Sequence, residues 1–257
     1  MNFVQGDIIT FPVVGQSGVS NPHQTVQYGD ELLVPDLVRL SVASGSKDMG
    51  LIHSGLQGGD TIWRLTKTCG HWSIKGEIQQ KAGSGPRHAT ISGDLLFTLH
   101  EKDNTLTAQE IPPLGITNVT SFISVETIIP TDRPFKPADF AAGELLLPGV
   151  SPGSDFAKPF LYASNRFIGT TPDPRGDSIA IFSFDCHGTL KLVNQAFTGL
   201  FNIRGMQFGG PDNRYLVASG VSQAGGVVVF ERTEGGANLM EVARNTQIPN
   251  LATFVWL

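Results

Sequence analysis

Apolar and polar positions alternate along most of the chain in short runs, and glycine, proline, asparagine or aspartate ends nearly every run. A two-residue period is typical of strands, whereas an amphipathic helix repeats its apolar positions every three to four residues. Short strands bounded by turn residues are found in all-β sandwiches, barrels and propellers. The pattern therefore predicts an all-β protein.

Four segments repeat the same order of an apolar strand, a polar turn and an alternating strand. They are residues 31–36 joined with 60–65, then 94–110, 159–184 and 214–232. A unit of roughly 40 to 50 residues with four strands is the period of a propeller blade. The repeat therefore favours a propeller among these three all-β architectures.

Residues 38–57 interrupt the first of these repeats and show no strand alternation. Without them, VPDL joins GGDTIWRL as a tight strand–turn–strand unit, as in the other repeats. We interpret this segment as an insertion foreign to the fold. A translated intron and an ordinary surface loop are its two explanations.

Charge and hydropathy exclude two classes of partner. The net charge is -5 and the sequence pI is about 5.6, so the chain has no basic surface for a nucleic-acid backbone. No apolar run approaches the roughly 18 residues of a membrane span. The first Lys or Arg is Arg39, which makes the N-terminus a poor signal peptide and predicts a cytoplasmic protein.

The sequence contains no motif for a cofactor or a metal ion. Cys69 and Cys186 lie far apart without metal-binding spacing, so we expect them to be buried structural thiols. No P-loop or dinucleotide fingerprint occurs. The string from Gly149 to Gly153 has the G-x-S-x-G spacing, but prolines flank Ser151 and no helical pattern follows, which favours a loop over a nucleophile elbow.

A set of motifs in fixed order resembles the lactonase family of seven-bladed β-propellers, which includes 6-phosphogluconolactonase and carboxy-cis,cis-muconate cyclase. The motifs are NPHQ (21–24), LLVPDL (32–37), GSGPRH (83–88), FTLHEKDNTLT (97–107), LYASNR (161–166), DSIAIF (177–182) and IRGMQF (203–208). The resemblance implies that residues 1–257 form a single partial β-propeller domain with about five of the seven blades, so that about two N-terminal blades are missing. An open ring exposes strand edges, so self-association through open blade edges is expected.

The resemblance and the local patterns select four catalytic candidates. His23 follows Pro22 at the Pro-His position of the family, although Thr25 replaces the family's second histidine. Arg87 follows a glycine- and proline-rich turn, and its planar guanidinium matches a carboxylate or phosphate. Glu101 and Arg166 each end an apolar strand, where ligand groups of a propeller collect.

Three further residues are candidates for substrate binding: Asp36, His88 and Arg204. Arg166 and Arg204 are predicted to occupy similar positions at the inner ends of two later repeats. Asp36 has an equally good interpretation as a residue that bonds turn backbone. Asp177 is predicted to serve a tight turn.

The resemblance implies a lactonase that needs no cofactor and acts on a small anionic substrate, a sugar-acid lactone such as 6-phosphogluconolactone. Arg87, Arg166 and Arg204 would anchor the anion, while His23 and Glu101 would transfer protons. A carboxymuconate-type cycloisomerase of the same fold is an alternative. A non-catalytic propeller binding protein or a truncated inactive homologue is another.

Overall fold

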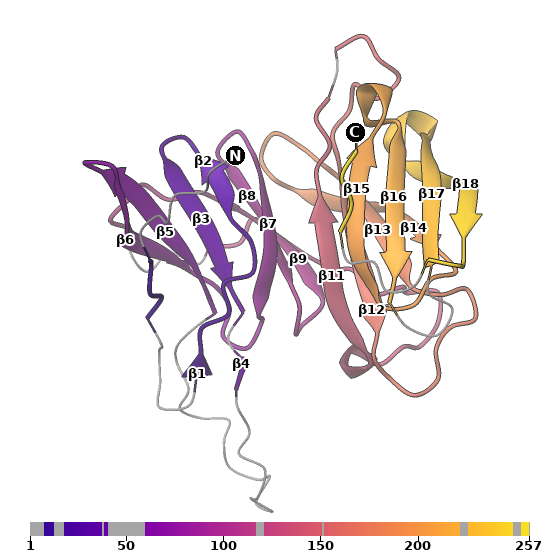
Figure 1. Cartoon of the computed structure of the whole chain (residues 1–257), viewed down its shortest axis with the longest axis horizontal. Coiled ribbons are helices and arrows are strands. Elements are labelled where there is room, and N and C mark those ends of the chain that lie inside the picture. The colour runs from indigo at the N-terminus through magenta and orange to yellow at the C-terminus, as the bar shows by residue number, and fades with distance from the viewer. Residues whose placement is uncertain are drawn as a thin grey trace, which may run out of the picture.

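The computed structural model describes residues 8–12, 18–37, 39–40, 60–116, 121–150, 152–221, 226–248 and 253–256. Most of the 38–57 segment lies outside these residues, so the insertion stays a prediction. Four antiparallel sheets follow one another from the N-terminal to the C-terminal end of the chain (Figure 1). None of the helices in the described residues is long and apolar enough to cross a membrane.

Each four-stranded sheet is a simple meander, which we call a blade. Blade 1 contains β2 (Val26–Tyr28), β3 (Glu31–Asp36), β5 (Thr61–Thr68) and β6 (His71–Gln79); blade 2 contains β7 (Pro86–Ser92), β8 (Leu95–His100), β9 (Thr105–Glu110) and β10 (Ser124–Thr127). Blade 3 contains β11 (Phe140–Leu146), β12 (Phe160–Phe167), β13 (Ser178–Phe184) and β14 (Leu190–Phe197); blade 4 contains β15 (Ile203–Gly209), β16 (Tyr215–Gly220), β17 (Gly226–Thr233) and β18 (Asn238–Asn245). Outside the blades lie the strand pair β1 (Gly18–Val19) and β4 (Arg39–Leu40), and the short 3-10 helices η1 (Pro137–Asp139), η2 (Pro211–Asn213) and η3 (Glu234–Gly236).

The repeats seen in the sequence are the second and third strands of each blade. β3 pairs directly with β5, with Asp36 opposite Thr61, so the first repeat closes across the interruption as expected. The all-β propeller fold is confirmed, but the described residues form four blades rather than about five. The difference arises because connections such as 147–159 and 168–177 use more of the chain than a compact blade needs.

Three apolar cores lie between successive blades, and alternate residues of the facing strands form them. The core between blades 1 and 2 includes Leu33, Ile62, Ile78 and Leu96; that between blades 2 and 3 includes Phe97, Leu99, Leu161 and Phe182; that between blades 3 and 4 includes Tyr162, Ile181, Leu216 and Phe230. β12 contributes to two of these cores through opposite faces, which explains its continuous apolar run from Phe160 to Ala163. Burial of these side chains fixes how each blade packs on the next.

The outer face of blade 1 has a fourth, smaller core. Val34, Trp63 and Leu65 are buried there, and Phe11 packs against them with its ring centroid 6.5 Å from that of Trp63. Residues before the first blade therefore cover part of the face that has no neighbouring blade in the described residues. Self-association through open blade edges stays a prediction.

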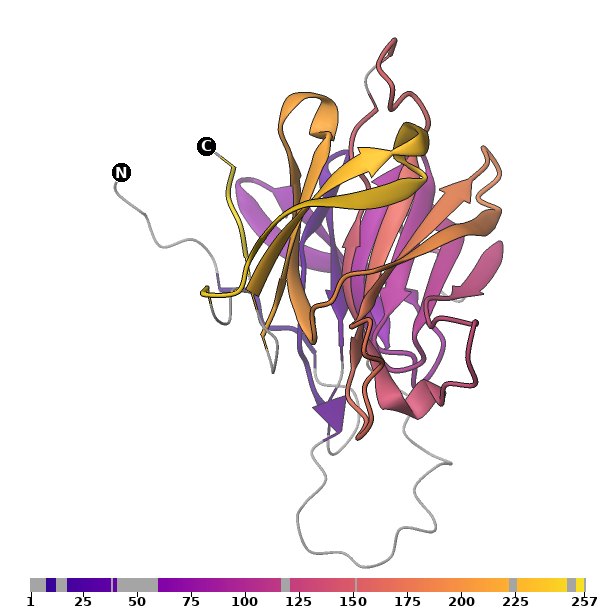
Figure 2. The ribbon, with the colours of Figure 1, turned by 90° about the vertical axis from the view of Figure 1, so that its right-hand side faces the viewer.

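The first strands of blades 2, 3 and 4 lie next to each other, because β7 contacts β11 and β11 contacts β15. Figure 2 shows blade 4 in front with the other blades behind it. The innermost strands therefore bring one end of several blades close together.

Candidate functional site

The innermost strands β7, β11 and β15 each contain a bulge at the same end. A bulge leaves one residue unpaired and re-aims its side chain. The bulged position holds Arg87 in β7, Gly143 and Glu144 in β11, and Arg204 in β15. In blade 1, His23 takes the corresponding place. The repeated bulge thus offers one functional position from each blade.

Glu101 joins two arginines from neighbouring blades. Its Oε2 accepts a hydrogen bond from Nη1 of Arg87 at 2.5 Å, and its Oε1 lies 3.1 Å from Nη2 of Arg166. Nε of Arg87 also donates to the carbonyl of Gly143 at 2.8 Å, and Arg166 donates to the carbonyl of Ala142. Both guanidinium groups are almost fully buried, so a chain of charged groups links blade 2 to blade 3.

Two histidines and a second glutamate lie beside this chain. The rings of His23 and His88 meet edge to face, with centroids 4.7 Å apart. Nε2 of His88 lies 3.4 Å from Oε1 of Glu144, which is itself 4.0 Å from Nη2 of Arg87. His23 remains solvent-accessible, whereas His88 is buried. The structure therefore brings together the predicted residues His23, Arg87, His88, Glu101 and Arg166.

The electrostatics of this cluster fix the charge of its acids and of His23. Burial would raise the pKa of Glu101, but Arg87 and Arg166 outweigh it and hold the pKa below its usual value. Burial also acts on Glu144, whose pKa is nevertheless lowered by its contact with His88 and by Arg87. Partial desolvation, followed by the positive charge of Arg87, lowers the pKa of His23 to about 4. At neutral pH both glutamates are charged and His23 is neutral.

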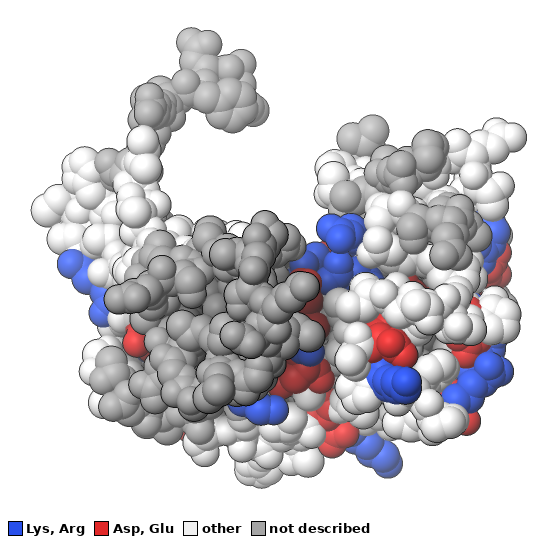
Figure 3. All heavy atoms as spheres, turned by 90° about the horizontal axis from the view of Figure 1, so that it is seen from below, with Lys and Arg blue, Asp and Glu red and all other residues white. Residues whose placement is uncertain are grey.

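Arg87 and Arg166 balance the charges of Glu101 and Glu144, and Arg204 nearby adds one positive charge. Figure 3 looks onto this end of the blades, where blue and red atoms gather near the middle of the face. This additional positive charge attracts small anions. The pairing with Arg87 and Arg166, which lowers the pKa of Glu101, also makes Glu101 a weak proton donor at neutral pH, in contrast to its predicted role in proton transfer.

Arg204 lies at the margin of the cluster. Its side chain is exposed, and its Nε donates a long hydrogen bond of 3.4 Å to the side chain of Asn202. It is close enough to Arg166 to contribute to lowering the pKa of that residue, after burial and Arg87. The predicted equivalence of Arg166 and Arg204 is wrong: Arg166 ends a second strand, as Glu101 does, whereas Arg204 sits in an innermost strand, as Arg87 does.

Asp36 does not face the site. It is completely buried and accepts hydrogen bonds from the hydroxyl of Ser20 at 2.6 Å, the amide of Asn21 at 2.6 Å and the indole of Trp63 at 2.8 Å. A carboxylate with no exposed surface cannot contact a ligand directly. The structure replaces the predicted substrate-binding role with the backbone-bonding alternative, through which Asp36 holds the segment that carries His23.

Sequence reasoning missed Glu144 and the carbonyl of Gly143. Both occur in FAAGELL, where apolar residues surround them and no motif marks them. The available signal was the repeat itself, because Ala142-Gly143-Glu144 aligns with Pro86-Arg87-His88 at the start of the innermost strand. Gly143 also allows close packing: a Cβ there would lie 2.5 Å from the hydroxyl of Ser164.

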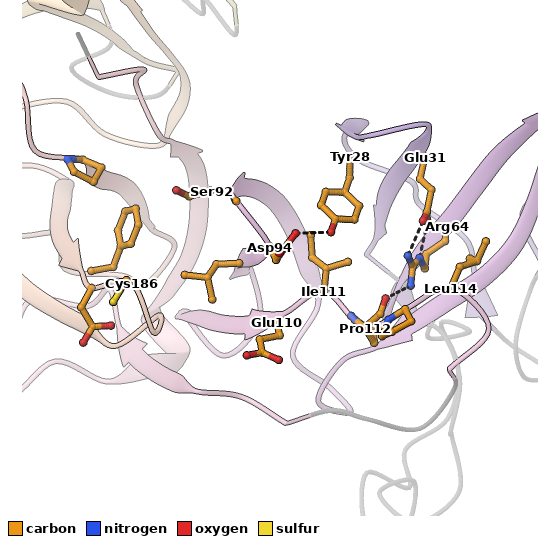
Figure 4. A pocket seen from close by; sticks show the side chains of 16 residues that line it. Tyr28, Glu31, Arg64, Ser92, Asp94, Glu110, Ile111, Pro112, Leu114 and Cys186 are labelled. Atoms are coloured by element: carbon orange, nitrogen blue, oxygen red, sulfur yellow. Dashed lines mark hydrogen bonds and ion pairs between the residues drawn. The ribbon is translucent and has the colours of Figure 1, made fainter. Parts of the chain in front are cut away.

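A groove of about 880 Å³ lies at the opposite end of the same strands (Figure 4). Its arginine, Arg64, is held by Glu31 through two contacts of 2.7 Å and by the carbonyl of Pro112 at 2.5 Å. Asp94 there accepts a hydrogen bond from Tyr28. Because the groove has no free cation or histidine among its lining residues, we place the candidate site at the bulged ends instead.

The described residues contain no group of three or more His, Cys, Asp or Glu side chains that could hold a metal ion. Cys69 and Cys186 are both free and exposed, so the prediction that they are buried is wrong. Each lies in an exposed turn at a strand end, Cys69 in the β5–β6 turn and Cys186 in the β13–β14 turn. Ser151 lies outside the described residues, and the residues after it form turns rather than a helix.

The fold and the cluster at the inner strand ends define a β-propeller with a polar central site. A sequence model of the family described as "Lactonase, 7-bladed beta-propeller" matches residues 58–256. The chain belongs to this lactonase family. No curated protein matches the sequence.

Solved structures share the fold at low sequence identity. A protein from Lactobacillus plantarum is 20% identical with a TM-score of 0.65, and the match covers 91% of this chain and 57% of that protein. A candidate 6-phosphogluconolactonase from Bacteroides fragilis is 21% identical with a TM-score of 0.60, over 88% of this chain and 56% of that one. A periplasmic gluconolactonase from Pseudomonas aeruginosa is 17% identical with a TM-score of 0.60, over 88% and 54%. This chain thus spans little more than half the length of these relatives.

Proposed function

We propose that this protein is a lactonase that hydrolyses a small anionic sugar-acid lactone such as 6-phosphogluconolactone. The observation that carries the proposal is a neutral, accessible His23 beside a cluster in which Arg87 and Arg166 are buried and charged. Family membership and the names of two relatives, a candidate 6-phosphogluconolactonase and a gluconolactonase, support the choice of substrate class.

The proposed reaction uses water and no cofactor. The arginines bind the anionic group of the substrate and stabilise the negative charge that develops on the lactone carbonyl oxygen. Neutral His23 accepts a proton from the attacking water as the new carbon–oxygen bond forms. When the tetrahedral intermediate breaks the ring ester bond, the imidazolium returns this proton to the departing alkoxide and leaves a hydroxy acid.

The two glutamates act through their neighbours in this proposal. Glu101, whose pKa is lowered, stays charged and holds Arg87 and Arg166 in place. Glu144 contacts His88, which packs against the ring of His23. Both are therefore positioning residues, and His23 is the residue that moves a proton.

The test is hydrolysis of 6-phosphogluconolactone and, in parallel, of a muconolactone by the purified chain. We expect His23→Gln to lower kcat by about 100-fold or more, since general base catalysis contributes about 10² to 10⁴. The matched control is His187→Gln, an exposed histidine in the turn between β13 and β14. Equal activity of the two variants would reject the role of His23.

A non-catalytic binding protein is the second candidate. Thr25 at the second histidine position of the family pattern favours it. In that case gluconate or phosphate should bind at the arginines while neither lactone is hydrolysed above the buffer rate. Binding without turnover by the wild-type chain would select this candidate.

A further inference from the structure

One polar residue stands immediately before the third strand in each of the first three blades. These residues are Asp60 before β5, Asn104 before β9 and Asp177 before β13. In each case the backbone carbonyl accepts a hydrogen bond from the residue that follows the fourth strand, namely Gln80, Ile128 or Thr198. The three residues therefore occupy the same place in the repeat.

Their side chains all reach into the next blade. Asp60 accepts hydrogen bonds from the amides of Gly83 at 2.6 Å and Gly85 at 2.7 Å. Asp177 accepts from the amide of Asn202, at the entry to blade 4, at 2.5 Å, and also from the amide of Phe167 in its own blade at 2.8 Å.

The amide of Asn104 acts in the opposite sense, because it donates to the carbonyls of Pro137 at 3.1 Å and Phe140 at 3.0 Å. The side chain at this place thus matches what the next blade presents: a carboxylate meets N–H groups and an amide meets carbonyls.

The segments held in this way lead directly into the bulged strands of the site. Gly83 and Gly85 both have positive φ and precede Arg87 by two to four residues. Glycines in such a conformation have little rigidity of their own. The carboxylate of Asp60 connects both amides to blade 1 and restricts this turn. Asn202, held by Asp177, likewise stands two residues before Arg204.

We propose that Asp60 and Asp177 are positioning residues of the site, each holding the entry to the next blade's innermost strand so that Arg87 and Arg204 lie at their bulged positions. The inference rests on the proposed function for its kinetic consequences. The position of Arg87 relative to His23 does not depend on the proposed function and can be tested without catalysis.

Asp60→Asn is the decisive variant, because it is nearly isosteric but turns an NH₂ group toward one of the two glycine amides. We expect kcat/KM for the lactone to fall about 10- to 100-fold, since misplacement of a catalytic group by about 1 Å can cost 10²-fold. The pKa of His23, measured by NMR, should rise from about 4, because the charge of Arg87 contributes to lowering it.

The matched control is Asp94→Asn. Asp94 also links blades 1 and 2, through the hydroxyl of Tyr28 at 2.8 Å, but it lies at the opposite end of the strands. We expect this variant to keep kcat/KM within about twofold of wild type and to leave the pKa of His23 unchanged. Comparable melting temperatures of the two variants would exclude a general loss of stability as the cause.

Asp177→Asn decides the question if Asp60→Asn does not fold. It should weaken binding of inorganic phosphate, measured by calorimetry, by about tenfold while the pKa of His23 stays near 4. A purely structural role predicts that Asp60→Asn and Asp94→Asn behave alike in both kinetics and His23 titration, and that result would overturn the inference. A wild-type chain without lactone hydrolysis would instead reject the proposed function, while the His23 titration would still test the positioning role.

Discussion

Arg87 and Arg204 occupy the same bulged position in blades 2 and 4, yet their surroundings differ completely. Arg87 is 5% exposed and is fixed by Glu101 and by the carbonyl of Gly143 from the following blade. Arg204 is exposed and has one long contact with Asn202. Among the described residues no further sheet lies beyond blade 4 to supply the partners that blade 3 supplies to Arg87.

This difference shows that the blade carrying a site residue determines where the residue lies but not what surrounds it. The repeat places the side chain, because the bulge belongs to the strand itself. The next blade then determines whether the side chain is buried, paired and held in one rotamer. A cation in the middle of the row is therefore buried and paired, and the same residue type at its end is exposed.

The largest expected difference is in stability. Arg87→Gln removes one partner of a buried ion pair and leaves Glu101 paired only with Arg166, which typically costs about 3–5 kcal/mol. Arg204→Gln changes an exposed side chain and should alter the free energy of unfolding by less than about 0.5 kcal/mol. Urea unfolding of the two variants measures both values, and similar losses would contradict the comparison.

A smaller loss of stability is expected at the entry to blade 1, where Asp36 of the same blade holds Ser20 and Asn21. The entry to blade 2 is instead held by Asp60 of the preceding blade. Asp36→Ala leaves the indole N–H of Trp63 without its acceptor, and each buried donor left unpaired costs about 1–3 kcal/mol. We expect a total loss of about 3 kcal/mol by urea unfolding. Asp30→Ala, in the exposed turn between β2 and β3, is the control and should change little.

Kinetics separate this structural role of Asp36 from the substrate-binding role that the sequence suggests. A variant that is destabilised but still folded at low temperature should keep the wild-type KM. An increase in KM that exceeds the effect of Arg204→Gln, at a temperature where both variants are folded, would restore the direct binding role.

Much of the fold could be predicted because the repeat is local. The apolar runs around Leu33, Leu96, Leu161 and Leu216 each became the second strand of a blade, and the pairing of β3 with β5 followed from the interrupted motif. The number of blades could not be predicted equally well, because the lengths of the connections follow no period.

Within the site, sequence identified residues whose type is unusual for their place and missed those whose partners lie in another blade. His23, Arg87 and Glu101 stand beside recognisable turns. Glu144 follows Gly143 in an apolar strand. Its place in the site is evident from its contacts with His88 and Arg87, which are more than 50 residues away in the sequence. The burial of Asp36 likewise depends on Trp63, which lies beyond the interruption.

The smallest and most specific effect is expected in the titration of His23. Burial and Arg87 place its pKa at about 4 instead of the usual 6.5, so the folded state favours the neutral imidazole. A lowered pKa means that this contribution to stability is present above pH 6.5 and is lost as the pH falls toward 4. The NMR signals of His23 should accordingly titrate near pH 4.

Arg87→Gln should shift this titration toward 6.5, whereas Arg204→Gln should leave it in place. Of these two arginines, Arg87 contributes to the lowered pKa of His23 and Arg204 does not. His100 provides an internal reference in these two variants: its pKa is also lowered to about 4, chiefly by burial and without a contribution from Arg87. A shift of both histidines in Arg87→Gln would indicate a general loosening of blade 2. A shift of His23 alone would assign the effect to the charge at the bulged position, which the exposed arginine of blade 4 does not reproduce.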